Sequence, residues 1–169
     1  MADVVDPATR SRMMSGIRGK NTKPEIALRR SLHRSGLRYR LHSTHLPGRP
    51  DIVFPSRKIA IFVHGCFWHR HHGCYWCSTP SSNSEFWNAK FEGNVQRDRE
   101  AAEALRGAGW RVAVVWECGL RASSTDDTVA RLLAWIRSGT GDFESPLVRR
   151  LSSDCYGNSD STSGRTRGH

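Results

Sequence analysis

Three segments of the chain place apolar residues at the three-to-four-residue spacing of an amphipathic helix. The first spans residues 22–35, and Thr22 with Glu25 has the sequence of a capping box at its beginning. The second spans residues 85–106, and the third spans residues 124–138. Each segment therefore predicts a helix with one face turned toward a hydrophobic core.

Four shorter segments predict strands. Residues 37–41 alternate strictly between apolar and polar side chains, which is typical of a half-buried strand. Residues 51–54 and 59–63 are apolar and a short turn joins them, so these two strands should pair antiparallel. Residues 111–116 predict a buried strand. The order helix, strands, helix, strand, helix predicts an α/β fold in which helices flank a mixed β-sheet.

The length of 169 residues suits one domain with its own hydrophobic core. Residues 1–21 are polar and basic and predict an arm, with a short helix over residues 7–17. Residues 22–138 contain the other periodic segments and are the predicted domain. Residues 139–169 turn to Ser, Gly, Asp and Arg without apolar periodicity, so we expect this tail to be disordered.

The net charge is strongly positive. The chain carries 26 Lys and Arg against 16 Asp and Glu, a formal charge of +10, and eleven of the basic residues lie within the first fifty. A field of this sign attracts polyanions, so it favours nucleic-acid binding over the alternative of a merely soluble basic protein. The arm residues expected to contact DNA are Arg10, Arg12, Arg18 and Lys20.

No apolar run approaches the ~18 residues of a membrane span, and the N-terminus lacks the basic and apolar segments of a signal peptide. The sequence therefore predicts a cytoplasmic protein with no membrane partner. In that reducing compartment, its five cysteines are expected to be thiols or metal ligands rather than disulfides.

Two acids are candidates for a catalytic cation site. Asp51 begins a buried strand, where a carboxylate is unfavourable unless it pairs or binds a cation, and Mg²⁺ prefers such hard oxygen ligands. Glu25 shares one helical stripe with Leu28 and Leu32, which turns it toward the sheet. The alternatives are a strand-initiating turn for Asp51 and a helix cap for Glu25.

His64 directly follows the strand 59–63, and His69 lies five residues further along. Imidazole titrates near neutral pH and can take a proton from a water that attacks phosphorus. A lone histidine is usually a surface residue, but His71 and His72 follow closely and make a cluster of four. We therefore expect His64 and His69 at the catalytic end of the sheet, near Asp51.

A second, softer metal site is predicted downstream. The spacings His-x₂-Cys and Cys-x₂-Cys within residues 71–77 are typical of Zn²⁺ ligands. A carboxylate on the inward stripe of the second helix needs a partner, and a cysteine follows the last predicted strand. The candidate ligands are His71, Cys74, Asp98 and Cys118, with Cys77 as the substitute if Asp98 pairs with an arginine. The alternative is a loop with buried thiols and a salt-bridged aspartate.

Three aromatic residues are candidates for insertion between DNA bases. Phe67 and Trp68 lie in a polar, His-rich loop rather than on a periodic apolar face, and Trp87 begins the second helix. Apolar wedges of this kind separate base steps and bend DNA. The alternative is a small local core that packs the loop onto the helix, and it is strongest for Trp87, which also lies on the inward stripe.

Several segments together resemble the very short patch repair endonucleases, the Vsr family. The run His64-Gly-Cys-Phe-Trp-His69 is the most specific of them, and the resemblance covers roughly residues 6–137. The segments are Asp-Pro-Ala-Thr-Arg-Ser-Arg-Met-Met at 6–14, Leu-Pro-Gly-Arg-Pro-Asp at 46–51, Phe-Val-His-Gly-Cys-Phe-Trp-His at 62–69, Asn-Val-Gln-Arg-Asp at 94–98 and Trp-Glu-Cys at 116–118.

The resemblance implies a fold related to type II restriction endonucleases. It also implies nicking of double-stranded DNA 5′ to the thymine of a T·G mismatch left by deamination of 5-methylcytosine. For such a nuclease we expect mismatch-repair proteins as candidate partners and a place in the cytoplasm at the bacterial nucleoid. A mismatch has no two-fold symmetry, so we also expect a monomer.

The resemblance also implies roles for single residues. Asp51 and the backbone carbonyl of Val63 would hold Mg²⁺. His69 would be the general base, supported by His64 and Glu25. The rings that would intercalate are Phe67, Trp68 and Trp87, and the residues that would hold structural zinc are His71, Cys74, Asp98 and Cys118.

The chain also departs from the expected patterns. Restriction-type nucleases carry a second acid and a lysine on the strand that here spans 59–63, and this strand has neither. Gly73 lengthens the spacing from His71 to Cys74, and Cys77 adds a competing thiol. Two alternative functions remain at this point: a zinc-stapled DNA-binding module without catalysis, and a nuclease of the same fold with another specificity.

Overall fold

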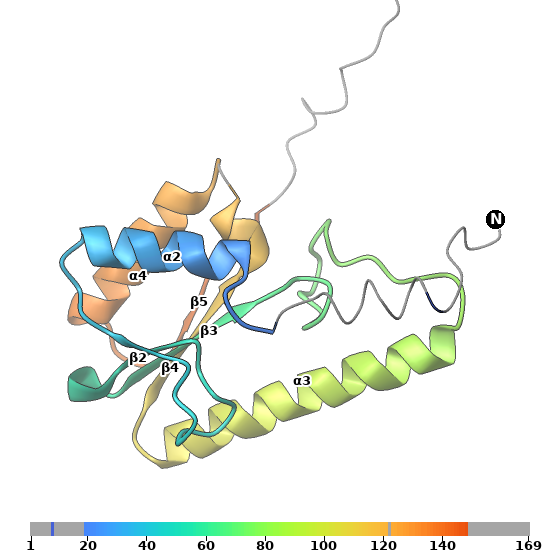
Figure 1. The fold of residues 1–169 in the computed structure, drawn as a ribbon, viewed down its shortest axis with the longest axis horizontal. Helices are drawn as coiled ribbons and strands as arrows, with labels where there is room; N and C mark the ends of the chain where they lie inside the picture. The colour runs from blue at the N-terminus through green and yellow to red at the C-terminus, as the bar shows by residue number, and fades with distance from the viewer. Residues whose placement is uncertain (1–7, 9–18, 122, 149–169) are drawn as a thin grey trace, which may run out of the picture.

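The computed structural model describes Ala8, residues 19–121 and residues 123–148 (Figure 1). Three predictions therefore lie outside the described residues: the helix over most of residues 7–17, the DNA contacts of Arg10, Arg12 and Arg18, and the disorder of the tail beyond Val148.

The described chain folds into a five-stranded sheet with helices on both sides. Strand order is β1-β2-β3-β4-β5, in which β2 runs antiparallel to both β1 and β3, whereas β3, β4 and β5 are parallel. The predicted mixed sheet flanked by helices is thus confirmed. In chain order the elements are α2 (Lys23–Arg34), β1 (Arg40–Leu41), β2 (Ile52–Phe54), the 3-10 helix η1 (Pro55–Arg57), β3 (Ile59–His64), α3 (Ser84–Gly107), β4 (Arg111–Trp116), the 3-10 helix η2 (Glu117–Leu120), α4 (Thr125–Ser138) and β5 (Phe143–Glu144).

The two faces of the sheet are covered by different helices (Figure 1). Successive side chains of a strand point to opposite faces, and β3 shows this alternation. Ile59 and Ile61 pack into the core formed with α2 and α4, whereas Ala60 and Phe62 pack against Leu105 and the inward face of α3. A strand buried on both faces explains why the sequence of β3 is apolar throughout.

Helix α2 begins as the sequence predicts. The Thr22 hydroxyl accepts the Glu25 N–H and the Glu25 carboxylate accepts the Thr22 N–H, which completes the capping box. Glu25 is also only 1% exposed and lies on the same inward stripe as Leu28 and Leu32. Both predictions for Glu25, the cap and the inward orientation, are therefore confirmed.

Two element boundaries differ from the prediction. Only residues 40–41 of the predicted strand 37–41 form β1, and both are exposed. Leu37 and Tyr39 pack on the core but lie outside the strand. Residues 139–148, assigned by the sequence to a disordered tail, contain β5. Side chains hold this short strand: Asp142 accepts the Val112 N–H at 3.1 Å and pairs with Arg106. Such contacts leave no periodic signal in the sequence.

The topology brings three chain segments to one edge of the sheet. The parallel strands β3 and β4 end there, with His64 opposite Trp116, and residues 65–83 and η2 follow them. Because β2 runs the opposite way, its start beside Asp51 lies at the same edge. Ligands commonly bind at the carboxyl ends of parallel strands, so this edge is where a site is expected.

Within the described residues, no helix is both long and apolar enough to cross a membrane.

We expect Leu132→Ala to lower the free energy of unfolding by about 2–5 kcal/mol. Leu132 lies on α4, is 0% exposed and packs in the core with strand residues, so truncating its side chain leaves a cavity. Chemical denaturation followed by circular dichroism measures this change. The matched control is Leu41→Ala: Leu41 is 43% exposed, so its truncation should stay within about 0.5 kcal/mol. Equal effects of the two substitutions would contradict the assigned core.

Candidate active site

A cavity of about 790 Å³ lies at the carboxyl edge of the sheet. Its wall includes the predicted catalytic residues Asp51, His64 and His69, together with the backbone segment at Val63 and the α3 residue Asp98. Basic side chains complete the rim: Lys20, Arg49 and Arg97. Acidic, imidazole and basic side chains therefore line one cavity, an arrangement that suits the binding of a polyanion.

Asp51 is fixed by the neighbouring strand. Its Oδ2 accepts the backbone N–H of Val63 at 2.8 Å. Burial raises the pKa of the Asp51 carboxyl, while the Val63 hydrogen bond and the nearby Arg29 and His69 oppose that rise. Residues two apart on a strand face the same side, and the Ile61 carbonyl accepts the Asp51 N–H, so we expect the Val63 carbonyl on the β2 side as well. A carboxylate and a carbonyl on one edge are oxygen donors that suit Mg²⁺.

The two histidines form a stacked pair beside Asp98. The rings of His64 and His69 lie 4.0 Å apart at an interplanar angle of 5°. Nδ1 of His69 is 2.6 Å from Oδ2 of Asp98, whereas Nε2 of His64 is 3.8 Å from Oδ1 of the same carboxylate. A carboxylate accepts hydrogen bonds, so Nδ1 of His69 donates and its Nε2 is left to accept a proton.

Burial separates the properties of the two imidazoles. His64 is 7% exposed, and this burial, with the neighbouring His69, lowers the pKa of His64 to about 3. His64 is therefore neutral at physiological pH and packs between Phe62, His69 and Trp116. His69 is the more exposed of the two and lines the cavity. The geometry thus favours His69 as the group that exchanges protons.

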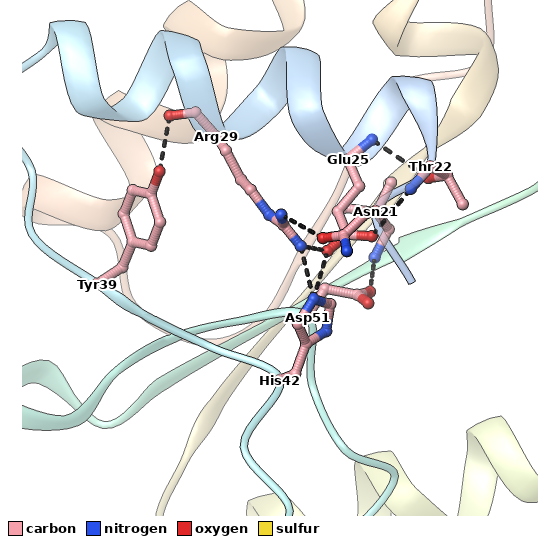
Figure 2. Close-up of polar contacts among 8 residues, drawn as sticks. Asn21, Thr22, Glu25, Arg29, Tyr39, His42 and Asp51 are labelled. Carbon is pink, nitrogen blue, oxygen red and sulfur yellow. Dashed lines mark hydrogen bonds and ion pairs between the residues drawn. The ribbon is translucent and has the colours of Figure 1, made fainter. Parts of the chain in front are cut away.

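A third group of candidate ligands adds a residue that the sequence did not indicate. His42 joins Glu25 and Asp51, and the ligand atoms of the three lie within 4.8 Å of one another (Figure 2). The Arg29 guanidinium pairs with Glu25 and reaches His42. Burial, Arg29 and Lys20 lower the pKa of the His42 imidazole. The pairing of β1 with β2 explains the position of His42, because continuing this register by one residue places residue 42 opposite Asp51.

The softer ligands gather in a separate, buried cluster, the Cys₃His cluster, made of Cys66, His71, Cys74 and Cys118. Here the structure corrects the predicted set: Asp98 lies with the two stacked histidines, and Cys66 takes the fourth place. Cys77 only packs against the outside of the cluster. One feature of the sequence could have indicated Cys66: it lies five residues before His71, close enough for the loop to bring the two side chains together.

The Cys₃His cluster fits a tetrahedral metal ion. Nδ1 of His71 lies 3.6 Å from Sγ of Cys66 and 3.4 Å from Sγ of Cys118. Zinc bonds of 2.0–2.3 Å at tetrahedral angles place ligand atoms roughly 3.5–3.8 Å apart. A hydrogen bond from Cys66 lowers the pKa of the Cys118 thiol, and the thiolate is the form that binds metal. The ring of His71 also stacks on Trp116, which fixes its orientation.

The predicted DNA-inserting residues form an aromatic cluster between the loop and α3. Phe67 contacts Trp68, Trp87 and Phe91 with ring centroids 5.0–5.7 Å apart. Trp87 is only 6% exposed, which is what the local-core alternative predicts for this residue. Trp68 instead lines a second cavity of about 480 Å³ that also contains His69 and Lys90. Of the three rings, Trp68 is therefore the one shown to face a cavity beside the site.

The chain is similar in sequence to known DNA endonucleases. A sequence model of the family described as DNA mismatch endonuclease Vsr matches residues 2–78. The chain is 46% identical over 139 residues to the DNA mismatch endonuclease Vsr of Escherichia coli strain K12, which covers 80% of this chain and 88% of that protein. It is 52% identical over 120 residues to the type II nicking enzyme V.XorIIP of Xanthomonas oryzae pv. oryzae, covering 71% and 88%.

Among solved structures, the catalytic domain of the homing endonuclease I-Bth0305I aligns with a TM-score of 0.46 at 19% identity, covering 69% of this chain and 97% of that domain. The residues that match the family model include Asp51, His64 and His69. The chain therefore belongs to the Vsr family of DNA mismatch endonucleases and is an endodeoxyribonuclease.

Proposed function

We propose that the chain nicks one strand of double-stranded DNA 5′ to the thymine of a T·G mismatch, in a Mg²⁺-dependent reaction that begins the repair of deaminated 5-methylcytosine. One observation carries the proposal: Asp51 and the His69–Asp98 pair line a single cavity with a basic rim. Family membership supports the mismatch substrate, because the Escherichia coli relative is named a DNA mismatch endonuclease.

The proposed cation site consists of oxygen donors. Asp51 and the Val63 carbonyl would hold Mg²⁺, since both face the same edge of the sheet. When bound, Mg²⁺ stabilises the negative charge that develops on the phosphodiester. The Val63 N–H holds one oxygen of the Asp51 carboxylate in place and so limits its rotation.

His69 is the proposed general base. Asp98 holds Nδ1 of His69 as a donor, so Nε2 can take the proton from the attacking water. His64 stacks on the ring and prevents it from tilting. Asp98 is thus proposed as a positioning residue in place of its predicted role as a zinc ligand.

Charged and aromatic side chains around the cavity are proposed to bind the duplex. Lys20, Arg49 and Arg97 lie where DNA phosphates would approach, and the arm residues Arg10, Arg12 and Arg18 would extend this contact. Trp68 and Phe67 would enter the base stack, with Trp87 supporting them from α3.

The proposed structural metal is zinc, held by Cys66, His71, Cys74 and Cys118. The role of this ion would be structural: it would link the loop after β3 to the segment that follows β4. We further propose that the chain acts as a monomer, because a T·G site has no two-fold symmetry. A place at the nucleoid and mismatch-repair proteins as partners are part of the same proposal.

Strand-resolved cleavage of short duplexes tests the proposal. In Mg²⁺ we expect a single nick 5′ to the mismatched thymine, no cut in a matched duplex, and no cut of either in excess chelator. Equal cutting of matched DNA would instead favour a nuclease of other specificity. Tight binding without any cleavage would favour the non-catalytic DNA-binding module.

A further inference from the structure

The Arg29 guanidinium lies inside a group of three candidate metal ligands, Glu25, His42 and Asp51. Their donor atoms lie within 4.8 Å of one another. Nη2 of Arg29 is 2.7 Å from Nε2 of His42 and also pairs with Oε1 of Glu25 (Figure 2). One nitrogen of Arg29 thus contacts two atoms that a divalent cation would use in this group.

These contacts and metal binding exclude each other. A guanidinium has only N–H donors, so Nε2 of His42 must accept the hydrogen bond from Arg29 with the lone pair that a metal would need. The Glu25 oxygen that pairs with Arg29 lies 3.2 Å from the same His42 nitrogen. A cation could bind both residues only after Arg29 had moved away.

Arg29 is held against such a movement. Its Nη1 donates to Oδ1 of Asn21 at 2.8 Å, and its backbone carbonyl accepts the Tyr39 hydroxyl at 2.9 Å (Figure 2). The side chain is 13% exposed, and the Glu25 side chain it neutralises is 2% exposed. Withdrawing Arg29 would leave a buried carboxylate without its counter-charge, which is strongly unfavourable.

The backbone at His42 gives independent support for a specialised site. His42 has a φ of 47°, in the left-handed region that non-glycine residues rarely adopt. Its N–H donates to the Asp51 carbonyl at 3.1 Å, which ties the strained residue to the residue that begins β2. Strained backbone of this kind concentrates at functional sites.

We propose that Arg29 is a built-in cation that occupies Glu25 and His42 and so limits this nuclease to one divalent ion, held by Asp51 and the Val63 carbonyl. The proposal rests on the magnesium-dependent function proposed above. The fixed positive charge of the guanidinium takes the place that a second divalent ion occupies in two-metal nucleases. Arg29 acts through Glu25 and His42 and is therefore a positioning residue.

Manganese binding to the full-length, zinc-loaded chain tests this assignment without relying on activity. Free Mn²⁺ is counted by electron paramagnetic resonance during a titration, and electron spin echo spectra report whether a histidine nitrogen binds the ion. For the wild-type chain and for Arg30→Met, a neighbouring exposed arginine, we expect one bound ion. For Arg29→Met we expect two ions and a nitrogen coupling that disappears in the double variant Arg29→Met/His42→Ala.

Two bound ions in the wild-type chain, with a nitrogen coupling removed by His42→Ala, would overturn the proposal; one ion in a folded Arg29→Met variant would do the same. If Arg29→Met does not fold, the wild-type and His42→Ala measurements decide alone. Nicking of a T·G duplex is recorded in parallel. One bound ion without Mg²⁺-dependent nicking would defeat the proposed function but leave the Arg29 assignment standing, and two ions with normal nicking would defeat the assignment alone.

Discussion

Replacing Asp51 with asparagine is expected to lower the single-turnover nicking rate on a T·G duplex by roughly a thousandfold, about 4 kcal/mol of transition-state stabilisation. Asparagine has nearly the same shape, and its carbonyl oxygen can still accept the Val63 N–H. It lacks the negative charge that would hold the cation. Rapid-quench measurement with enzyme in excess over DNA isolates this step from product release.

The thermal stability of Asp51→Asn is the control for this prediction. Burial raises the pKa of this carboxyl above its unfolded value, so the protonated form favours folding and that contribution is lost as pH rises through the folded pKa. Neutral asparagine removes the penalty of the buried charge at pH 7. The unfolding temperature of the Asp51→Asn variant should therefore equal or exceed that of the wild-type chain. A variant that nicks normally would show that the cation site lies elsewhere.

Replacing Cys118 with serine is expected to remove stoichiometric zinc and to lower the free energy of unfolding by at least about 3 kcal/mol. Binding of a structural zinc ion contributes directly to folding free energy, and Cys118 is a member of the Cys₃His cluster that is 0% exposed. Elemental analysis of the purified protein gives the zinc content, and chemical denaturation gives the stability. We expect the same two losses for Cys66→Ser.

Asp98→Asn is the matched control for the zinc prediction, because the sequence placed Asp98 among the ligands and the structure places it beside His69. This variant should keep its zinc and its stability. Its nicking rate should fall by roughly 10²–10⁴-fold, since His69 loses its orienting carboxylate. Zinc loss in Asp98→Asn together with zinc retention in Cys66→Ser would restore the ligand set predicted from the sequence.

Local rules explain why part of the site could be predicted. A capping box with an inward stripe determines where Glu25 points, and an apolar strand bounded by an acid places Asp51 at the edge of the sheet. His64 follows a strand, so its position depends on one boundary only. Each of these inferences uses residues that are close together in the chain, where periodicity and hydrogen-bond patterns act directly.

The remaining residues depend on contacts between distant segments. The stripe on α3 correctly turns Asp98 inward, but periodicity identifies a face and not the side chain that the face meets. His69, 29 residues earlier, lies 2.6 Å from Asp98, whereas Cys66, Cys74 and Cys118 group with His71. Arg29 lies on α2 and His42 directly follows β1, so their contact depends on how these two segments pack together. The two-residue strand β5 is too short for any pattern. Asp142, just before it, binds the Val112 N–H of β4 and the Arg106 side chain of α3, and Glu144 accepts the indole N–H of Trp116.

The loop that carries His69 also carries Cys66, His71 and Cys74, so His69 is flanked in sequence by cluster residues on both sides. With zinc bound as proposed, an ion that takes no part in the chemistry would anchor the segment that carries His69, the proposed proton acceptor. A chain synthesised in a zinc-starved cell would leave the ribosome with every catalytic side chain but with this segment unsecured. The supply of one micronutrient would then set how much of the endonuclease in such a cell is able to nick DNA.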